Sequence, residues 1–439
     1  MSHVYPRNSK SPPPMVSHGN GAYLYDDAGK AFLNCGDAAV SCLGHGDPHV
    51  TSAIKAQLDQ VAFAHTGYFT SEPAERLADR LVSVAPDGLD RVYFVSGGSE
   101  AMESALKLAR QYCIEIGQPE RHRVIARRQS YHGNTLGALA TGGNAARRAP
   151  FAPLLMEVSH VSPCYAYRGQ NDGETDAQYV DRLMDELEAE VAAHGPERVM
   201  AIVAEPVVGA TLGAVPPVGD YFRRVRQLCD RHGILLIFDE VMCGMGRTGT
   251  LFASEQYGVA PDICAIAKGL GAGYQPIGAM LCTATIHDTI RDGSGFFQHG
   301  HTYLGHPVAC AAALAVLERQ LDDQVLARVT PLGDALHDAL TERFGQHPHV
   351  GDIRGVGLFR AIELVQSRET KDPFDPARKV HARLKAAAFD EGLICYPMGG
   401  TVDGKFGDHV LLAPPFVLAD GDVARIVDRL ERAVQRTLV

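Results

Sequence analysis

The sequence contains a lysine and an aspartate whose placement suggests joint chemistry on a carbonyl compound. Lys268 ends the apolar run 263–267 and precedes Gly269, while Asp239 ends the apolar run 235–238. A lysine in an apolar pocket loses its charge readily and becomes a nucleophile toward carbonyl groups. A carboxylate at the end of a buried strand needs a cation or donors, and a protonated ring nitrogen would suit it. Either residue alone is also typical of a solvent-facing strand end, so the pair indicates a site more strongly than either member.

A cradle for an anion is the third feature. Gly97, Gly98 and Ser99 follow the strand-like run 91–96 and open a helical stretch that continues from Ala101. Glycines let a ligand approach the backbone, and the free N–H groups of a helix start attract anions. An ordinary helix start, capped by Ser99 with Glu100 in the first turn, explains the same residues. The chain has no Gly-x-x-x-x-Gly-Lys-Ser/Thr segment, which argues against a nucleotide P-loop.

Four more residues fall at comparable places. Tyr131 and His132 follow the strand-like run 124–127, Glu205 ends the run 200–204, and Thr302 precedes an alanine-rich helical stretch. They offer an aromatic face, an imidazole, a carboxylate and a hydroxyl donor. Ordinary core packing for Tyr131 and His132, and a helix-approach cap for Thr302, are the plain alternatives.

The elements that must position these residues alternate along the chain. Helix-period stretches at 50–60 and 72–84 alternate with strand-like runs that continue through 263–267, which predicts an α/β fold with a doubly wound, mostly parallel sheet. In such sheets ligands bind at the carboxyl ends of strands. We expect a large domain over residues 50–320 and a smaller α+β domain from both termini, residues 1–49 and 321–439. Within the first segment, residues 21–33 are typical of a hairpin.

Composition limits the class of protein. The 439 residues include 41 Lys plus Arg and 52 Asp plus Glu, a net charge of −11, which argues against a general nucleic-acid or anionic-membrane binder. None of the ten cysteines forms a Cys-x-x-Cys pair, and we expect no metal site. The start of the chain is polar and proline-rich, without the apolar segment of a signal peptide. We therefore expect a cytoplasmic protein.

One glycine motif is misleading. Residues 244–249 match Gly-x-Gly-x-x-Gly. A dinucleotide site needs that motif directly after a strand and at the opening of a helix. Here Asp239 and Glu240 stand between the strand and the motif, and no clear helix start follows. The pattern does not favour a nicotinamide site.

Together, these residues resemble the class III aminotransferases, pyridoxal phosphate-dependent enzymes of fold type I that include ω-amino acid:pyruvate enzymes. The similarity runs from about Gly21 to Pro415. The blocks that carry it are residues 96–109, 131–133, 205–206, 239–249, 268–269 and 301–307.

The resemblance implies roles for the site residues. Lys268 and Asp239 would be catalytic, Lys268 holding pyridoxal 5'-phosphate as an internal aldimine and then acting as a base. Asp239 would pair with the ring nitrogen of the cofactor. Tyr131 and Val241 would cover the two ring faces.

Further cofactor contacts follow from the same resemblance. Gly97, Gly98 and Ser99 would hold the phosphate, and His132 and Glu205 would support the site. In this family the residue matching Thr302 comes from the partner subunit, which implies a homodimer.

Departures from the family pattern narrow the expected substrate. Asn134 stands where relatives acting on GABA, ornithine or acetylornithine carry an arginine, and Ala210 stands where they carry a glutamate. Ala210 is similar to the amine:pyruvate branch. That branch often has a mobile arginine shortly before a Gly-Asp-His segment, but in this chain the only basic residue near that segment is Lys405. The branch also has a tryptophan in its pocket, and the matching stretch here, residues 39–42, contains none.

The resemblance therefore implies an aminotransferase that moves an amino group from an ω-amino acid or amine to a 2-oxo acid, with pyruvate expected and pyridoxamine phosphate as the intermediate form. A decarboxylating transaminase, an aminomutase or a racemase on the same fold is the alternative. A roomier pocket and a larger donor amine are also expected.

Overall fold

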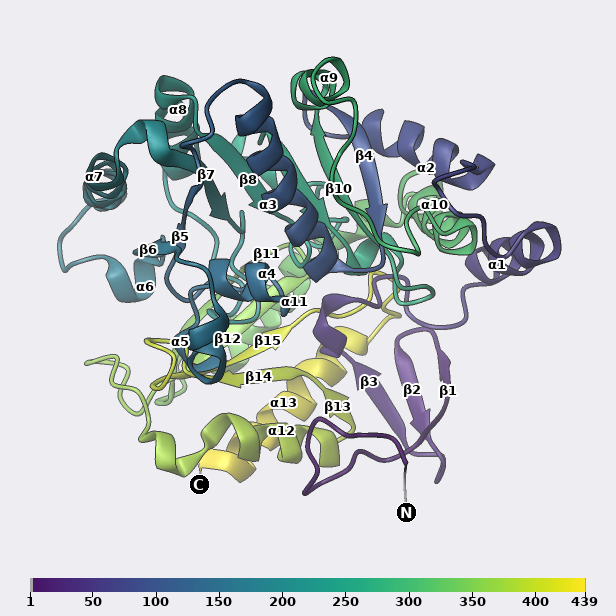
Figure 1. The fold of residues 1–439 in the computed structure, drawn as a ribbon. Coiled ribbons are helices and arrows are strands. Elements are labelled where there is room, and N and C mark those ends of the chain that lie inside the picture. The colour runs from purple at the N-terminus through teal and green to yellow at the C-terminus, as the bar shows by residue number, and fades with distance from the viewer. Residues whose placement is uncertain (1–2, 439) are drawn as a thin grey trace.

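The computed structural model describes residues 3–438, and its largest feature is a seven-stranded sheet (Figure 1). In order across the sheet, the strands are β4 (Leu89–Val95), β10 (Gly278–Thr283), β9 (Ile263–Ile266), β8 (Leu235–Asp239), β7 (Val199–Ala204), β5 (Arg123–Arg127) and β6 (Ser159–Val161). β10 runs antiparallel to its neighbours β4 and β9, whereas the other neighbouring strands pair in parallel. The predicted mostly parallel sheet is confirmed.

Helices cover both faces of this sheet because strand side chains alternate between them. On β8, Leu235 and Ile237 pack in the cluster that contains α3 (Gly98–Glu115) and α9 (Ala284–Asp292). Leu236 and Phe238 point the other way, toward α7 (Asp176–His194) and α8 (Tyr221–His232). The same side of β9 and β10 packs against α2 (Glu72–Val82) and α10 (Pro307–Leu321), and α10 also contacts α1 (Pro48–Gln60). An apolar run buried on both faces is typical of parallel strands.

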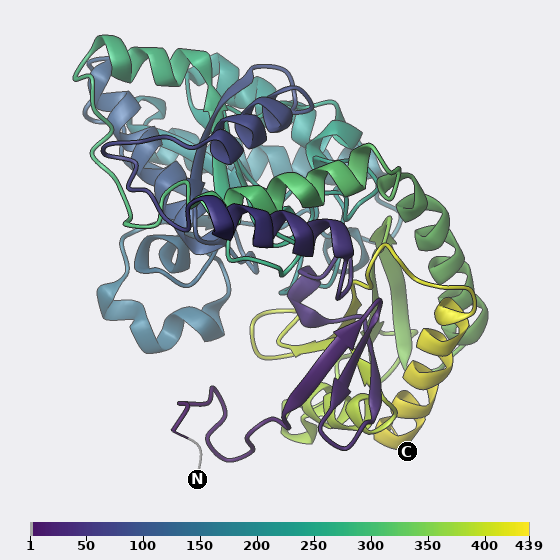
Figure 2. The ribbon, with the colours of Figure 1, turned by 90° about the vertical axis from the view of Figure 1, so that its right-hand side faces the viewer.

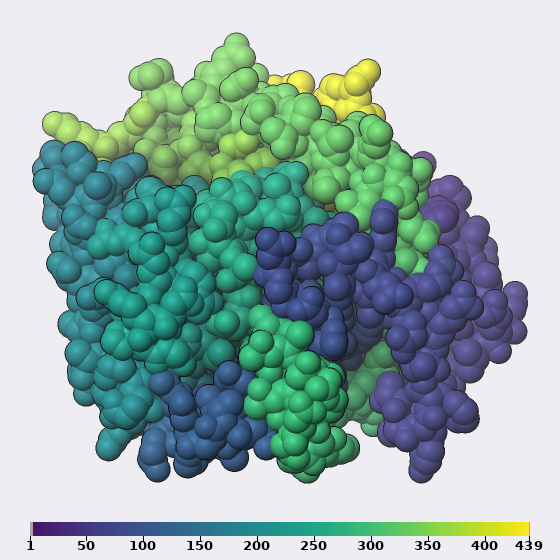
Figure 3. Space-filling model, turned by 90° about the horizontal axis from the view of Figure 1, so that it is seen from above, coloured from purple at the N-terminus to yellow at the C-terminus, as the bar shows by residue number. Residues whose placement is uncertain are grey.

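Figure 3 shows the face of the molecule that is seen from above, with teal residues on the left and blue and purple residues on the right. The green surface near residue 290, where α9 lies, stands between the teal region of α7 and α8 and the blue region of α2.

The two ends of the chain meet in a second layer of structure. β1 (Val16–Asn20), β2 (Tyr23–Asp26) and β3 (Ala31–Asn34) form a meander that β13 (Leu393–Ile394) extends by parallel pairing with β3. A further sheet has the order β11 (Val350–Val356), β12 (Phe359–Leu364), β15 (Asp408–Leu412) and β14 (Tyr396–Gly399). The helices beside them are α11 (Val329–Phe344), α12 (Val380–Asp390) and α13 (Asp422–Leu438). Figure 2 shows the purple N-terminal strands beside these green and yellow elements.

We propose that the chain divides near residues 50 and 320 into a large domain and a small one. The pairing of Leu33 with Leu393 supports this division, because it joins residues 1–49 to residues 321–439. Residues 1–2 and 439 of those segments lie outside the described residues.

Most predicted elements are confirmed within a few residues, but six strands were not predicted: β1, β6, β10, β11, β13 and β14. The hairpin at 21–33 corresponds to β2 and β3, and the terminal helix begins at Asp422. β6 and β11 are short or interrupted by polar residues, and β10 follows a glycine-rich turn without the intervening helix that the alternating pattern requires. The motif at 244–249 forms turns, not a helix start.

All ten cysteines are buried and unpaired. Across residues 3–438, no helix combines the length and the apolar character needed to cross a membrane.

Candidate active site

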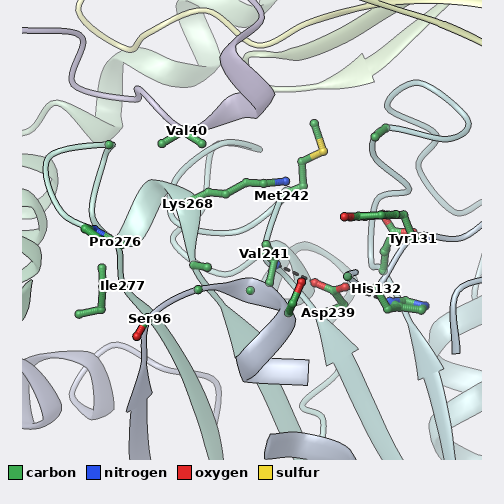
Figure 4. Close-up of a pocket in the computed structure, with 18 of the residues that line it drawn as sticks. Val40, Ser96, Tyr131, His132, Asp239, Val241, Met242, Lys268, Pro276 and Ile277 are labelled. Atoms are coloured by element: carbon green, nitrogen blue, oxygen red, sulfur yellow. Dashed lines mark hydrogen bonds and ion pairs between the residues drawn. The ribbon is translucent and has the colours of Figure 1, made fainter. Parts of the chain in front are cut away.

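Lys268 stands two residues after the end of β9, and its side chain extends into a cavity of about 480 Å³ (Figure 4). Its backbone has a φ of +46°, the left-handed region that a residue other than glycine rarely adopts. Such strain persists where the surrounding structure enforces it, often at functional sites. Burial lowers the pKa of Lys268 from its ordinary value of 10.5, against the opposing charges of Asp239 and Glu205. At a given pH, a larger fraction of Lys268 is therefore in the neutral amine form than for an exposed lysine.

Asp239 ends β8, the strand next to β9, and pairs in register with Ala265. Its side chain is 5% exposed. One carboxylate oxygen, Oδ1, accepts from the backbone N–H of Val241 at 3.0 Å, and Oδ2 accepts from Nδ1 of His132 at 2.9 Å. These donors stabilise the carboxylate in a place where burial alone would disfavour it. Figure 4 shows His132 and Asp239 side by side at the cavity.

Glu205, at the end of β7, fixes the backbone around the cavity. It accepts from the N–H of Tyr131 at 3.1 Å and from the N–H of Gly209 at 2.9 Å. Burial raises its pKa above the ordinary value, and the charge of Asp239 adds to that effect. Glu205 therefore ties the Tyr131 segment to the loop that carries Ala210.

The first turn of α3 forms the cradle predicted for an anion. Backbone N–H groups at a helix start have no partner within the helix and point toward an anion. A Cβ on Gly98 would lie 2.7 Å from Cγ1 of Val241, so only glycine lets the helix start and Val241 lie this close. The Ser99 hydroxyl accepts from the N–H of Asn134 at 2.9 Å, and Glu100 accepts from the N–H of Ser96 at 2.8 Å.

The cavity brings together nine of the ten residues that the sequence analysis singled out. They are Gly97, Gly98, Ser99, Tyr131, His132, Glu205, Asp239, Val241 and Lys268. Five strand ends and loops, far apart in the chain, supply them.

Thr302 is the exception. It lies in an exposed loop and does not line the cavity of its own chain. Its neighbours Tyr303 and His306 line a second cavity that shares Gln275, Pro276 and Ile277 with the first. A role for Thr302 in the site of a partner subunit stays a prediction.

Several lining residues were not among the predicted site residues, although the resemblance placed the stretch 39–42, which includes Val40, at the pocket. Val40, Met242, Gln275, Pro276 and Ile277 complete the walls (Figure 4). Val40 is more than two hundred positions from Lys268 and follows three non-glycine residues at positive φ, a conformation that the sequence gives no signal for. The glycine-rich stretch after Lys268 does indicate a turn, and Gln275 and Pro276 stand just beyond it.

The residues of the cavity fit pyridoxal phosphate. The amine of Lys268 has no hydrogen bond or ion pair with any other residue of the described chain, and Asp239 keeps a buried carboxylate beside it. The helix start accommodates a phosphate, and Tyr131 and Val241 offer surfaces for a planar ring. A carbonyl-bearing aromatic ring with a phosphate matches all three features.

Comparison with known proteins gives a consistent result. A family model described as aminotransferase class III matches residues 4–434. The chain is 44% identical over 428 residues to an uncharacterized aminotransferase of Schizosaccharomyces pombe, over 97% of this chain and 93% of that protein.

Two solved structures are similar throughout. The ω-transaminase of Pseudomonas jessenii in complex with PMP matches with a TM-score of 0.92 and 32% identity, over 99% of this chain and 96% of that one. A thermostable ω-transaminase variant with a tryptophan changed to glycine, engineered for synthesis of enantiopure bulky amines, matches with a TM-score of 0.93 and 32% identity, over 100% and 97%.

The low pKa of Lys268 is testable in the cofactor-free protein. We expect the rate of Lys268 acetylation, followed peptide by peptide by mass spectrometry, to rise with pH to a midpoint below 10.5, because burial disfavours the ammonium form. Asp239→Asn should lower that midpoint further, since the carboxylate of Asp239 stabilises the charged lysine. Asp262→Asn, at the opposite end of β9, is the matched control. An unchanged or higher midpoint in Asp239→Asn would contradict this description of the site.

Proposed function

The chain belongs to the class III aminotransferase family, and on that premise we propose that it moves an amino group from an ω-amino acid or amine to pyruvate. Its cofactor is pyridoxal 5'-phosphate, as in the family. The observation that carries the proposal is the amine of Lys268 beside the carboxylate of Asp239 in one cavity. The two ω-transaminase structures described above support an amine or ω-amino acid as donor.

The residues of this chain divide the chemistry among them. When bound, the cofactor supplies an aldehyde that takes up the amino group and a ring that withdraws electrons from the reacting carbon. Nζ of Lys268, as a neutral amine, accepts a proton from the substrate carbon and returns it at the neighbouring position. Asp239 would hold a proton at the ring nitrogen of the cofactor, and the contact of its Oδ2 with Nδ1 of His132 fixes the orientation of the carboxylate.

Two positions support the choice of substrate. Ala210 lines the cavity where a glutamate would stand in relatives acting on GABA or ornithine, and Asn134 is exposed where they carry an arginine. Neither residue offers the charges on which those relatives depend. An uncharged donor end therefore fits this cavity better than a second carboxylate.

A larger donor amine is also proposed. The side chain at the wall nearest the expected tryptophan position is Val40, and the chain has no Trp. The engineered variant for bulky amines lost a tryptophan as well. A smaller wall residue leaves more room for the donor.

The assembly proposed is a homodimer in which the partner's Thr302 completes the phosphate site. Exposed aromatic side chains lie next to Thr302: Tyr303 is 59% exposed and packs against Phe63, which is 40% exposed. Apolar patches of this kind mark protein–protein interfaces. We also propose a cytoplasmic setting, which the ten unpaired cysteines support.

Product analysis tests the reaction. With 1-phenylethylamine and pyruvate, we expect one alanine formed for each pyruvate consumed, and a loss of at least about 10³-fold in rate in Lys268→Ala because the proton-transfer group is gone. Lys385→Ala, which removes an exposed lysine from α12, is the control. Release of CO₂ would instead indicate a decarboxylating transaminase, and turnover without loss of the 2-oxo acid would indicate a mutase or racemase.

Mixed dimers test the position of Thr302. Co-expressed Lys268→Ala and Thr302→Ala chains should recover about a quarter of wild-type activity at limiting cofactor, because roughly half of random pairs are mixed and each holds one intact site. Each variant alone should be poorly active under the same conditions. If Thr302 served its own chain, no mixed dimer would have an intact site and mixing would recover nothing.

A further inference from the structure

The cavity as lined by its own residues has no cation left for a substrate carboxylate. Its charged side chains are Asp239, Glu205 and Lys268, and Lys268 is engaged by the cofactor. Yet every 2-oxo acid brings a carboxylate into this cavity. A carboxylate placed beside two others without a cation is strongly disfavoured, so we look for a positive group in this chain close behind the wall.

Arg147 is such a group. It lies on the short helix α5 (Ala145–Arg148), and its guanidinium carbon is 4.7 Å from the centre of the Tyr131 ring, which forms part of the wall. The side chain is partly buried. Burial raises the pKa of Tyr131 and lowers the pKa of Lys268, and the positive charge of Arg147 acts on both groups from behind the wall by favouring a lower pKa.

The guanidinium of Arg147 has its donors free. Stacking on an aromatic ring uses the flat face of the group, while its five N–H bonds lie in the plane and point outward. Within residues 3–438, the Arg147 side chain makes no hydrogen bond or ion pair. By contrast, Arg127 in β5 donates to the carbonyl of Glu205. A guanidinium with free N–H groups can bind a carboxylate in a bidentate way, through two parallel hydrogen bonds.

The backbone that carries Arg147 is fixed. Asn144 accepts from the N–H of Arg147 at 3.1 Å and donates to Oε1 of Gln129 at 3.3 Å. Gln129 in turn donates to the carbonyl of Gly400. The helix is therefore tied to the end of β5 and to the loop after β14, so the arginine can be placed in advance of substrate binding.

The other candidate positions are unsuitable. Lys405 is exposed, with its ammonium 5.2 Å from the centre of the Phe406 ring, and Asn134 is exposed and uncharged. We infer that Arg147 binds the carboxylate of the 2-oxo acid acceptor at the edge of the Tyr131 ring. This inference rests on the proposed function and names the specificity residue of that site.

Substitution of Arg147, with its neighbour as control, tests the inference in the holoenzyme. Arg147→Met keeps the length of the side chain and removes the charge. We expect the KM for pyruvate to rise about 10- to 100-fold, the loss typical of a charge-assisted pair, with the KM for 1-phenylethylamine within about twofold of wild type. Arg148 is next in the chain, and its charge acts on His160. Arg148→Met should therefore leave the KM for pyruvate and the KM for 1-phenylethylamine unchanged. Arg147→Lys should recover part of the affinity, because a lysine keeps the charge but not the fork.

A binding measurement separates this role from general damage. By calorimetry, the Kd of the holoenzyme for propanoate, an unreactive carboxylate, should rise in Arg147→Met by a similar factor and stay unchanged in Arg148→Met. An equal rise in the KM for pyruvate and in the KM for the amine would overturn the inference, because it would mean that Arg147 only supports Tyr131. A loss confined to Arg7→Met would also overturn it, since Arg7 is the other arginine whose charge reaches Tyr131. Wild-type protein that converts no amine would instead refute the proposed function.

Discussion

The structure depends on keeping one lysine amine among two carboxylates in a place largely removed from water. Burial lowers the pKa of Lys268, and the charges of Asp239 and Glu205 oppose that shift. The carboxylates survive burial because each has donors: Val241 and His132 for Asp239, backbone N–H groups for Glu205. Without that balance the cavity could neither hold a carbonyl-bearing cofactor nor move a proton.

The sheet supplies the geometry of this balance. β7, β8 and β9 are neighbours and parallel, so Glu205, Asp239 and Lys268 come from the same edge although they are separated by tens of residues in the chain. The strands are buried on both faces and leave polar groups only at their ends. The loop of Ala210 is held against this edge from the other side, where Arg354 donates to the carbonyl of Gly213 at 2.7 Å. The second layer of structure thus closes the cavity rather than supplying its chemistry.

Much of the fold and of the site could be predicted because it follows local rules. Apolar strands that run into Asp239 or Lys268 are visible in the sequence, and so are the glycines at the start of α3. Val40 was placed at the pocket only by resemblance, because its position depends on a strained loop, and Arg147 could not be predicted, since its position depends on a ring contact between separate segments. β10 was missed because an antiparallel strand needs no helix before it. The role of Thr302 in the site of a partner subunit was predicted by resemblance alone, and a single chain does not test it.

The central claim is that Lys268 and Asp239 support a two-stage transfer of an amino group. The most direct measurement is the visible absorbance of the holoenzyme before and after addition of β-alanine, putrescine or 1-phenylethylamine alone. We predict that the band of the lysine-bound cofactor falls with at least one of these donors and returns when pyruvate is added. No visible band, even after pyridoxal phosphate is supplied, would contradict the assignment of Lys268. A band that persists with every donor would contradict the proposed transfer from these amines.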